Sequence, residues 1–406
     1  MKGMGMKGGG AGRGLARGWG AWLVAWVFAA ACMAQTFEPP ERTPDGFLVP
    51  RPGRRFEFPQ DHGRHDGFKI EWWYVTGQVA AEDGRELGYQ LTFFRNGGPA
   101  APPAHQGAGA AAGAGGGGLF AHAPLHLAHC AVLDVKAGRF LHESRINREG
   151  WDAGAALGTL KVWNGPWRLE RTTPATGGPE TLQLRGGVRG EASMELRLVA
   201  EKPLVVFGTN GVSRKGRDPT ASSHYLTFTR LRTEGVVRIG GARMAVKGLS
   251  WMDHEFSSSQ LEPGQSGWDW ACVLLDDGTE LMAYRMRRDD GTTDPFSTLA
   301  WVGADGVPRH SGPDRFRWEV EGHWTSGLTG ARYPNRVRIT GPRRDGTGTM
   351  ELRLEPLMDA QEVADPLGGV AYWEGACRVR DGTGKIVGRA YLELAGYVGR
   401  LREKFR

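Results

Sequence analysis

The chain has 406 residues, of which 40% are hydrophobic and 24% charged, a balance typical of globular proteins with a substantial core. Its formal net charge is +6, but residues 1–34 contain four basic residues and no acid, which leaves 6 − 4 = +2 for the remainder. The apparent basicity therefore belongs largely to the first 34 residues, and the charge gives no indication of nucleic-acid binding.

Residues 1–34 have the pattern of a secretory signal peptide. A basic, glycine-rich opening precedes ten apolar residues, Trp22–Ala31, which are too few to span a bilayer. Cleavage is expected after Ala31 or Ala34, and the loose lipobox ending at Cys32 leaves a lipid tether at that cysteine open. We therefore expect an exported protein, periplasmic or secreted, either soluble or lipid-anchored, with a membrane export or transport complex as one candidate partner.

The next segments predict an irregular arm, a hairpin and a loop. Residues 35–66 are rich in proline and arginine and form the expected arm. Lys69–Val79 and Glu86–Arg95 alternate apolar and polar residues on either side of Asp83-Gly84, which predicts a β-hairpin. Residues 96–118 are almost entirely Gly, Ala and Pro and lack the Gly-Lys-Ser/Thr of a phosphate-binding loop, so we expect a disordered loop.

His122, His126 and His129 allow two interpretations. On a helix the first two would share a face and suggest a metal site. However, Pro124 lies between them and the following residues alternate as in a strand, which would place His126 and His129 on opposite faces. We therefore predict no metal site here.

The cysteines that follow the leader also give no metal signature. They lie far apart, without C-x-x-C spacing, at positions Cys130, Cys272 and Cys377. Their apolar or small neighbours predict buried free thiols that behave as small hydrophobic residues.

The remaining pattern predicts an all-β protein. Short apolar segments separated by Gly, Pro and Asp recur from residue 161 to 239 and from 271 to 394, without long helical periodicity. A faint repeat, Gly84–Leu87 and Gly278–Leu281, each shortly after a tryptophan pair, favours two similar halves. We expect an N-terminal domain at residues 67–235 and a C-terminal domain at residues 236–406.

Acidic and aromatic residues are concentrated in Trp251–Phe256 and Gly267–Trp270. Burial among indoles disfavours a charged carboxyl, so this concentration indicates either a hydrogen-bonded network or an acid of raised pKa. On a strand, Trp251, Asp253 and Glu255 would share one face. If that face lines a barrel lumen, the two carboxyls form a close pair in which one keeps its proton; a salt bridge from Asp253 to an arginine at a domain interface is the alternative.

Six motifs occur in the same order in a known group of proteins. They are Glu71–Gly77, Leu91–Arg95, Ala128–Ala131, Trp251–Phe256, Gly267–Trp270 and Tyr372–Gly375. Over roughly residues 55–400 the chain resembles the lipocalin-like family that includes carotenoid 1,2-hydratase (hydroxyneurosporene synthase) and exported proteins labelled predicted secreted hydrolases. The resemblance implies two lipocalin-like antiparallel β-barrel domains in tandem. The chain departs from the family in the Gly/Ala insertion, at Ser223–Tyr225 and at Phe256, where a tryptophan is common.

The resemblance to the hydratases implies acid-catalysed addition of water to a C=C bond of an apolar, isoprenoid-like substrate, with neither cofactor nor metal. It gives Asp253 the role of proton donor. Residues expected to position water or tune this acid are Glu255, His254, His224, Tyr225 and Glu71. Aromatic faces stabilise a carbocation by about 0.5–2 kcal/mol per ring. The expected substrate-binding residues are Trp251, Trp268, Trp270, Glu71, Trp72, Trp73 and His129.

Purely structural roles stay open for several of these residues, since Glu71 can simply accept hydrogen bonds and His129 and the tryptophans can belong to the core. A non-catalytic carrier of an apolar small molecule or lipid also stays open, because barrels of this size can enclose such a ligand. A secreted hydrolase has no supporting motif: Gly264–Gly267 lacks the last glycine of G-x-S-x-G, and His254-Glu255 lacks the second histidine of H-E-x-x-H.

Overall fold

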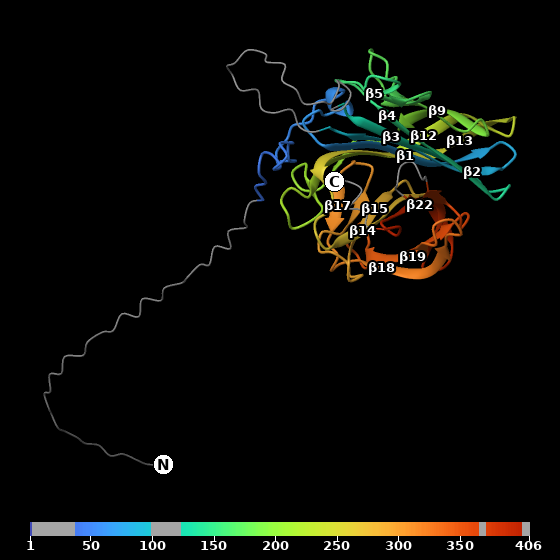
Figure 1. Cartoon of the computed structure of the whole chain (residues 1–406). Helices are drawn as coiled ribbons and strands as arrows, with labels where there is room; N and C mark the ends of the chain where they lie inside the picture. Colours follow the sequence, from blue (N-terminus) through green and yellow to red (C-terminus); the bar gives the residue numbers. More distant parts are fainter. Residues whose placement is uncertain (2–36, 99–122, 365–370, 400–406) are drawn as a thin grey trace, which may run out of the picture. The chain divides into compact units, whose positions relative to one another are not determined.

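The computed structural model describes residues 37–98, 123–364 and 371–399 together with Met1, and residues Phe37–Arg406 form one compact unit (Figure 1). The predicted signal peptide with Cys32, residues 99–118 of the predicted loop, and His122 lie outside the described residues. No described helix is long and apolar enough to cross a membrane.

The first sheet contains thirteen antiparallel strands, in the order β4-β3-β2-β1-β13-β12-β9-β8-β7-β6-β5, with β10 and β11 paired to β12. The strands are β1 (Ile70–Ala81), β2 (Glu86–Asn96), β3 (Leu125–Asp134), β4 (Arg139–Arg148), β5 (Ala153–Ala155), β6 (Lys161–Asn164), β7 (Trp167–Arg171), β8 (Thr181–Val188), β9 (Ala192–Ala200), β10 (Val205–Phe207), β11 (Ser213–Arg214), β12 (Ser222–Ile239) and β13 (Ala242–Ser259). Its end strands β4 and β5 are in contact, so this sheet is a nearly closed barrel.

The second sheet contains ten antiparallel strands, in the order β17-β16-β15-β14-β23-β22-β20-β19-β18, with β21 paired to β22 (orange to red in Figure 1). The strands are β14 (Gln265–Leu275), β15 (Glu280–Arg288), β16 (Thr298–Val302), β17 (Pro308–Ser311), β18 (Arg317–Thr325), β19 (Arg332–Pro342), β20 (Thr349–Pro356), β21 (Glu362–Ala364), β22 (Ala371–Asp381) and β23 (Ile386–Ala395). The prediction of an all-β fold with tandem antiparallel β-domains is confirmed.

The predicted hairpin is present as β1 and β2, which pair antiparallel from Ile70 opposite Asn96 to Ala80 opposite Glu86. Gly84 in the connecting turn has a φ of 79°, a conformation that glycine adopts without the strain of a side chain. Before the hairpin, the expected arm has one short 3₁₀ helix, η1 (Gln60–His62), and its Phe47 and Val49 are buried.

The two sheets divide the chain at a later position than we expected. Residues 235 and 236 lie inside β12, and the change of sheet comes between Ser259 and Gln265. β12 and β13 form one long hairpin whose turn, Gly240-Gly241, has positive φ at both residues, as a tight hairpin turn requires. The polar and glycine residues that resemble a linker in the sequence therefore belong to a continuous strand pair of the first sheet.

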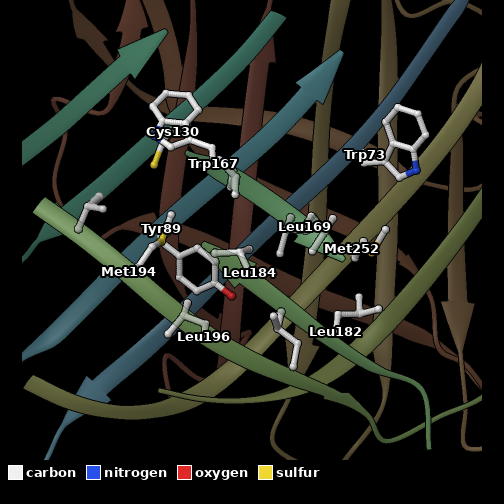
Figure 2. Close-up of a cluster of buried hydrophobic side chains, with 14 of the residues drawn as sticks. Trp73, Tyr89, Cys130, Trp167, Leu169, Leu182, Leu184, Met194, Leu196 and Met252 are labelled. Atoms are coloured by element: carbon white, nitrogen blue, oxygen red, sulfur yellow. The ribbon is translucent and has the colours of Figure 1, made fainter. Parts of the chain in front are cut away.

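Three apolar cores account for most of the buried side chains. The first lies inside the first sheet, where Figure 2 shows Trp73, Tyr89, Leu184 and Met252 packed together. The second lies inside the second sheet and includes Trp373. The third contains residues of both sheets and therefore lies between them. The first barrel is filled by its own side chains rather than hollow.

The predicted free thiols are confirmed. Cys130, Cys272 and Cys377 are all buried and none forms a disulfide. Burial raises the pKa of each thiol above its ordinary value, so all three are chemically inert at neutral pH.

Candidate functional site

The alternation of β13 directs the acidic residues away from the interior of the first barrel. Met252 belongs to the first core, so its neighbours Trp251 and Asp253 face the opposite side, towards the second sheet. In the pairing with β1, Asp253 lies opposite Tyr74 and Glu255 lies opposite Trp72. The predicted shared face of Trp251, Asp253 and Glu255 is therefore present, but it does not line a barrel lumen.

This face bounds a cavity of about 90 Å³ between the two sheets. The volume is enough for several water molecules or a small organic group. The first sheet and its loops contribute Trp72, Tyr74, Lys215, Tyr225, Asp253 and Glu255. The second sheet contributes Trp268, Trp270, Tyr284, Tyr372, Glu374 and Glu393.

Asp253 is only 3% exposed and is held by hydrogen bonds from three neutral donors. Its Oδ1 accepts hydrogen bonds from Trp251 Nε1 and Thr227 Oγ1, both at 2.7 Å. Its Oδ2 accepts one from the hydroxyl of Tyr225 at 2.8 Å, and that hydroxyl accepts one from Trp270 Nε1 at 3.0 Å. Burial raises the pKa of Asp253 to about 7, although the hydrogen bonds act in the opposite direction.

The alternative in which an arginine neutralises Asp253 is not what the structure shows, because no ion pair involves this carboxyl among the described residues. The arginine pairs of this region go to Asp269 instead, which Arg285 and Arg287 hold. Asp253 is thus a buried, uncompensated acid beside a cavity.

Glu255, two residues along β13, is in a different electrostatic environment. Its Oε2 accepts a short hydrogen bond from Ser223 and lies 3.3 Å from Lys215 Nζ. Burial acts to lower the pKa of Lys215, but the neighbouring acidic groups, Glu255 foremost and then Tyr284 and Asp253, together outweigh it, so the net shift is upward and the ammonium stays charged. Its Nζ also lies 4.8 Å and 4.5 Å from the ring centroids of Tyr225 and Tyr284. The two neighbouring acids therefore differ. Asp253 has no ion-pair partner among the described residues, whereas Glu255 pairs with Lys215.

The second sheet adds two carboxyls that we had not predicted. Glu374 on β22 lies directly opposite Glu393 on β23. The hydroxyl of Tyr74 donates to Glu374 Oε2 at 2.7 Å, and Trp268 Nε1 donates to Glu393 Oε1 at 3.0 Å. Burial, and secondarily the neighbouring carboxyl, raises the pKa of Glu374 well above its usual range, and burial raises that of Glu393 to about 8.

Two predicted residues lie immediately behind the cavity. Trp251 is fully buried; it donates a hydrogen bond to Asp253, and its ring lies 6.1 Å from that of Trp270 in an edge-to-face arrangement. His129 forms a short hydrogen bond through Nδ1 with the hydroxyl of Tyr372, which lines the cavity. His126 lies on the opposite face of β3, near Glu149, so the predicted separation of the two histidines is confirmed.

Four predicted residues lie on the far side of β1, β12 and β13, away from the cavity. Trp73 belongs to the first core and stacks on His254 with ring centroids 4.9 Å apart. His224 packs against Phe256, and its Nδ1 lies 2.6 Å from the carbonyl oxygen of Gly211. Because successive side chains of a strand point to opposite faces, His224 and His254 cannot join Tyr225 and Asp253 at one site.

Glu71, the fourth of these residues, is the centre of a buried charged network. His65 Nδ1 and His254 Nε2 lie 2.8 and 2.9 Å from its Oε1, and His65 Nε2 lies 2.9 Å from Asp61. Burial acts to raise the pKa of Glu71, but hydrogen bonds from the two histidines outweigh it and lower the value to about 2. Glu71 therefore connects the arm to the first sheet, and it is not among the residues that line the cavity.

The same network is a group that could hold a metal ion, because its ligand atoms from His65, Glu71 and His254 lie within 4.8 Å of one another. Hydrogen bonds already occupy the nitrogen and oxygen atoms that would bind the ion. Their geometry is that of an ion-pair network, and the adjacent Arg54 and Asp61 continue it.

Comparisons with known proteins identify the family. The family model described as AttH-like matches residues 49–397. A crystal structure described as an AttH protein from Nitrosomonas europaea is 34% identical, covers 86% of this chain and 99% of its own, and has a TM-score of 0.72. Kievitone hydratase from Nectria haematococca is 12% identical with a TM-score of 0.60, over 89% of this chain and 98% of its own, which shows a shared fold alone. No curated protein matches.

These matches confirm the resemblance drawn from the six sequence motifs at the level of family and fold. The chain belongs to the AttH-like family.

Proposed function

We propose that this protein is a cofactor-independent hydratase that adds water to a branched C=C bond, with Asp253 as the proton donor. The observation that carries the proposal is a buried carboxyl of raised pKa, without an ion pair to any described residue, on the wall of a cavity lined by indoles. A general acid works best when its pKa lies near the working pH, which is the case for Asp253.

The hydrogen bonds of Asp253 leave room for the proton that the reaction needs. A carboxylate has about four lone-pair positions, and Trp251, Thr227 and Tyr225 occupy three of them. The open position is on Oδ2, the oxygen that accepts only the hydrogen bond of Tyr225. Transfer of this proton to one alkene carbon forms a C–H bond, breaks the O–H bond and leaves the other carbon as a cation.

The cavity can stabilise that cation and supply the water that captures it. The faces of Trp268 and Trp270 provide negative quadrupole potential, worth about 0.5–2 kcal/mol per ring. The carboxylate of Glu255, held by Lys215, accepts a proton from water as its oxygen bonds to the carbon. Proton exchange with solvent then returns Asp253 and Glu255 to their starting states. Two neighbouring carboxyls in different electrostatic environments are the usual arrangement for a paired acid and base.

A non-catalytic carrier is the second candidate, and the aromatic wall of the cavity favours it. A cavity with Trp72, Phe94, Trp268 and Met286 in its lining would retain an apolar ligand without any reaction. The two functions differ in their dependence on the proton of Asp253. Binding of an apolar ligand requires shape and burial, whereas hydration requires this proton as well.

The test is incubation of the purified protein with α-methylstyrene in heavy-oxygen water, followed by mass spectrometry of the products. Protonation of this small alkene gives a tertiary cation, so a hydratase should form the labelled tertiary alcohol. Asp253→Asn keeps the shape of the side chain and should reduce the rate by about a hundredfold to ten-thousandfold, the usual contribution of a general acid.

The matched control is Glu82→Gln, which neutralises an exposed carboxyl in the turn after β1 and should leave the rate unchanged. If wild-type protein retains the alkene but forms no labelled alcohol, the carrier function replaces the hydratase. Equal rates in wild type and Asp253→Asn would remove Asp253 from the mechanism.

We also propose that the protein is exported, on the strength of the signal-peptide pattern in residues 1–34. Fractionation of cells that express the full chain should recover the mature protein outside the cytoplasm. Replacement of Cys32 by Ser should release it from membranes if that cysteine carries lipid, and should change nothing if a signal peptidase removes the residue.

A further inference from the structure

The carboxyl pair of Glu374 and Glu393 has no role in the reaction proposed above, yet it occupies one wall of the same cavity. The two residues are directly opposite on neighbouring strands and neither forms an ion pair with a described residue. Glu374 is completely buried, and its Oε1 has no hydrogen-bond partner in the described part of the chain. Burial of two carboxyls without a cation costs folding free energy, unless a bound ligand forms hydrogen bonds with them.

The surroundings of the pair favour neutral carboxylic acids. Each residue has one oxygen that accepts a hydrogen bond from an aromatic side chain, Tyr74 for Glu374 and Trp268 for Glu393. Two like charges on adjacent strands in an apolar environment repel, and burial disfavours both of them. The raised pKa values of the two groups agree with this geometry. A neutral carboxylic acid carries an O–H and can donate a hydrogen bond, which a carboxylate cannot do.

A pure hydrocarbon cannot use such donors. It would fill the cavity and displace water, and the acid pair would then face it with unsatisfied O–H groups. A carbonyl oxygen has two lone pairs and no proton, so it can accept from this pair while the apolar part of the ligand lies against Trp72 and Trp268.

We propose that Glu374 and Glu393 form a hydrogen-bond donor site for a carbonyl oxygen of the substrate, so that the apolar molecule implied by the family resemblance carries a carbonyl group. This inference rests on the proposed function for the position of the reacting double bond. Binding of the carbonyl oxygen does not depend on that reaction. Asp253 on the first sheet acts on the double bond, while the acid pair on the second sheet fixes its orientation.

The experiment compares two ligands of the same shape by calorimetric titration of the full chain. Acetophenone and α-methylstyrene differ in having a C=O or a C=CH₂ group at the same position. The wild-type protein should bind acetophenone at least about tenfold more tightly, which corresponds to about 1.4 kcal/mol. Equal affinities, or no measurable binding of either ligand, would overturn the proposal.

Two substitutions at Glu393 distinguish a donor from a mere polar contact. Glu393→Gln keeps an N–H donor and should retain most of the preference for acetophenone. Glu393→Met fills similar space without a donor and should bring the two affinities close together. A preference that survives in Glu393→Met, with folding verified by circular dichroism, would contradict the assignment.

The outcome is separable from that of the proposed function. If the protein prefers acetophenone and also retains α-methylstyrene without forming labelled alcohol from it, the hydratase is refuted and the carbonyl site stays in place. Formation of the alcohol without a preference for acetophenone would refute the carbonyl site and leave the hydratase in place. The Asp253→Asn variant should retain the preference in either case, because its carboxamide lies on the other sheet.

Discussion

Replacement of Asp253 by asparagine should remove a large part of the pH dependence of stability. The carboxyl is 3% exposed and burial raises its pKa to about 7, whereas the ordinary value is 3.8. Between these two values the folded chain retains a proton that the unfolded chain has released. The free energy of unfolding therefore falls as the pH rises through this window, and the loss is complete above the folded-state pKa.

The magnitude follows from the difference between the two pKa values. About three pKa units correspond to about 4 kcal/mol, since each unit is worth about 1.4 kcal/mol. More than half of this loss falls between about pH 5 and about pH 8, where the folded carboxyl titrates and the unfolded one is already ionised. Asparagine has nearly the same shape and no charge, so the variant should not show this component.

The assay is chemical denaturation of wild type, Asp253→Asn and the exposed control Glu82→Gln across that pH range. Wild type and control should lose stability in parallel, and Asp253→Asn should lose about 2–3 kcal/mol less than either. If all three lose the same amount, the carboxyl of Asp253 is not the buried acid that the structure describes.

Three further predictions concern other parts of the molecule. Leu184→Ala, in the first core, should lower the free energy of unfolding by about 2–5 kcal/mol in denaturant titrations. Lys215→Met leaves the carboxylate of Glu255 without its cation and should cost about 3–5 kcal/mol, whereas methionine at both positions should restore most of the melting temperature. Glu71→Gln should cost about 3 kcal/mol at neutral pH, because the folded pKa of about 2 lies below the ordinary 4.5; acid titration should show this deficit disappear as the pH falls from 4.5 to 2.

Most strands could be predicted from the sequence because side chains alternate along them with a period of two. Leu87, Tyr89 and Leu91 alternate in β2 and all belong to the first core. The same reasoning placed a domain boundary at residue 235, inside β12, because polar residues interrupt its apolar pattern there. In the structure a register shift between Phe228 and Leu231 keeps the strand paired, and one strand of 18 residues results.

The candidate site could be predicted only in part. Alternation correctly placed Trp251, Asp253 and Glu255 on one face, and it also puts Tyr225 and His224 on opposite faces. It does not show which surface that face meets. Lys215 lies in a loop without a motif. Glu374 and Glu393 reach the cavity through the packing of one sheet on the other, which no local pattern encodes; only the Tyr372–Gly375 motif gave a signal for Glu374.

The position of the cavity follows from β13, whose side chains belong alternately to two apolar cores. Met252 faces the core of the first barrel and Asp253 faces the layer between the sheets, so a single strand forms the wall between them. Each sheet has its own apolar core, and a third core with buried polar groups lies between the two sheets. Asp253 comes from one of these sheets and Glu393 from the other. Neither sheet alone can form the site, and a chain divided at residue 235 would separate Tyr225 from the carboxyl that it contacts.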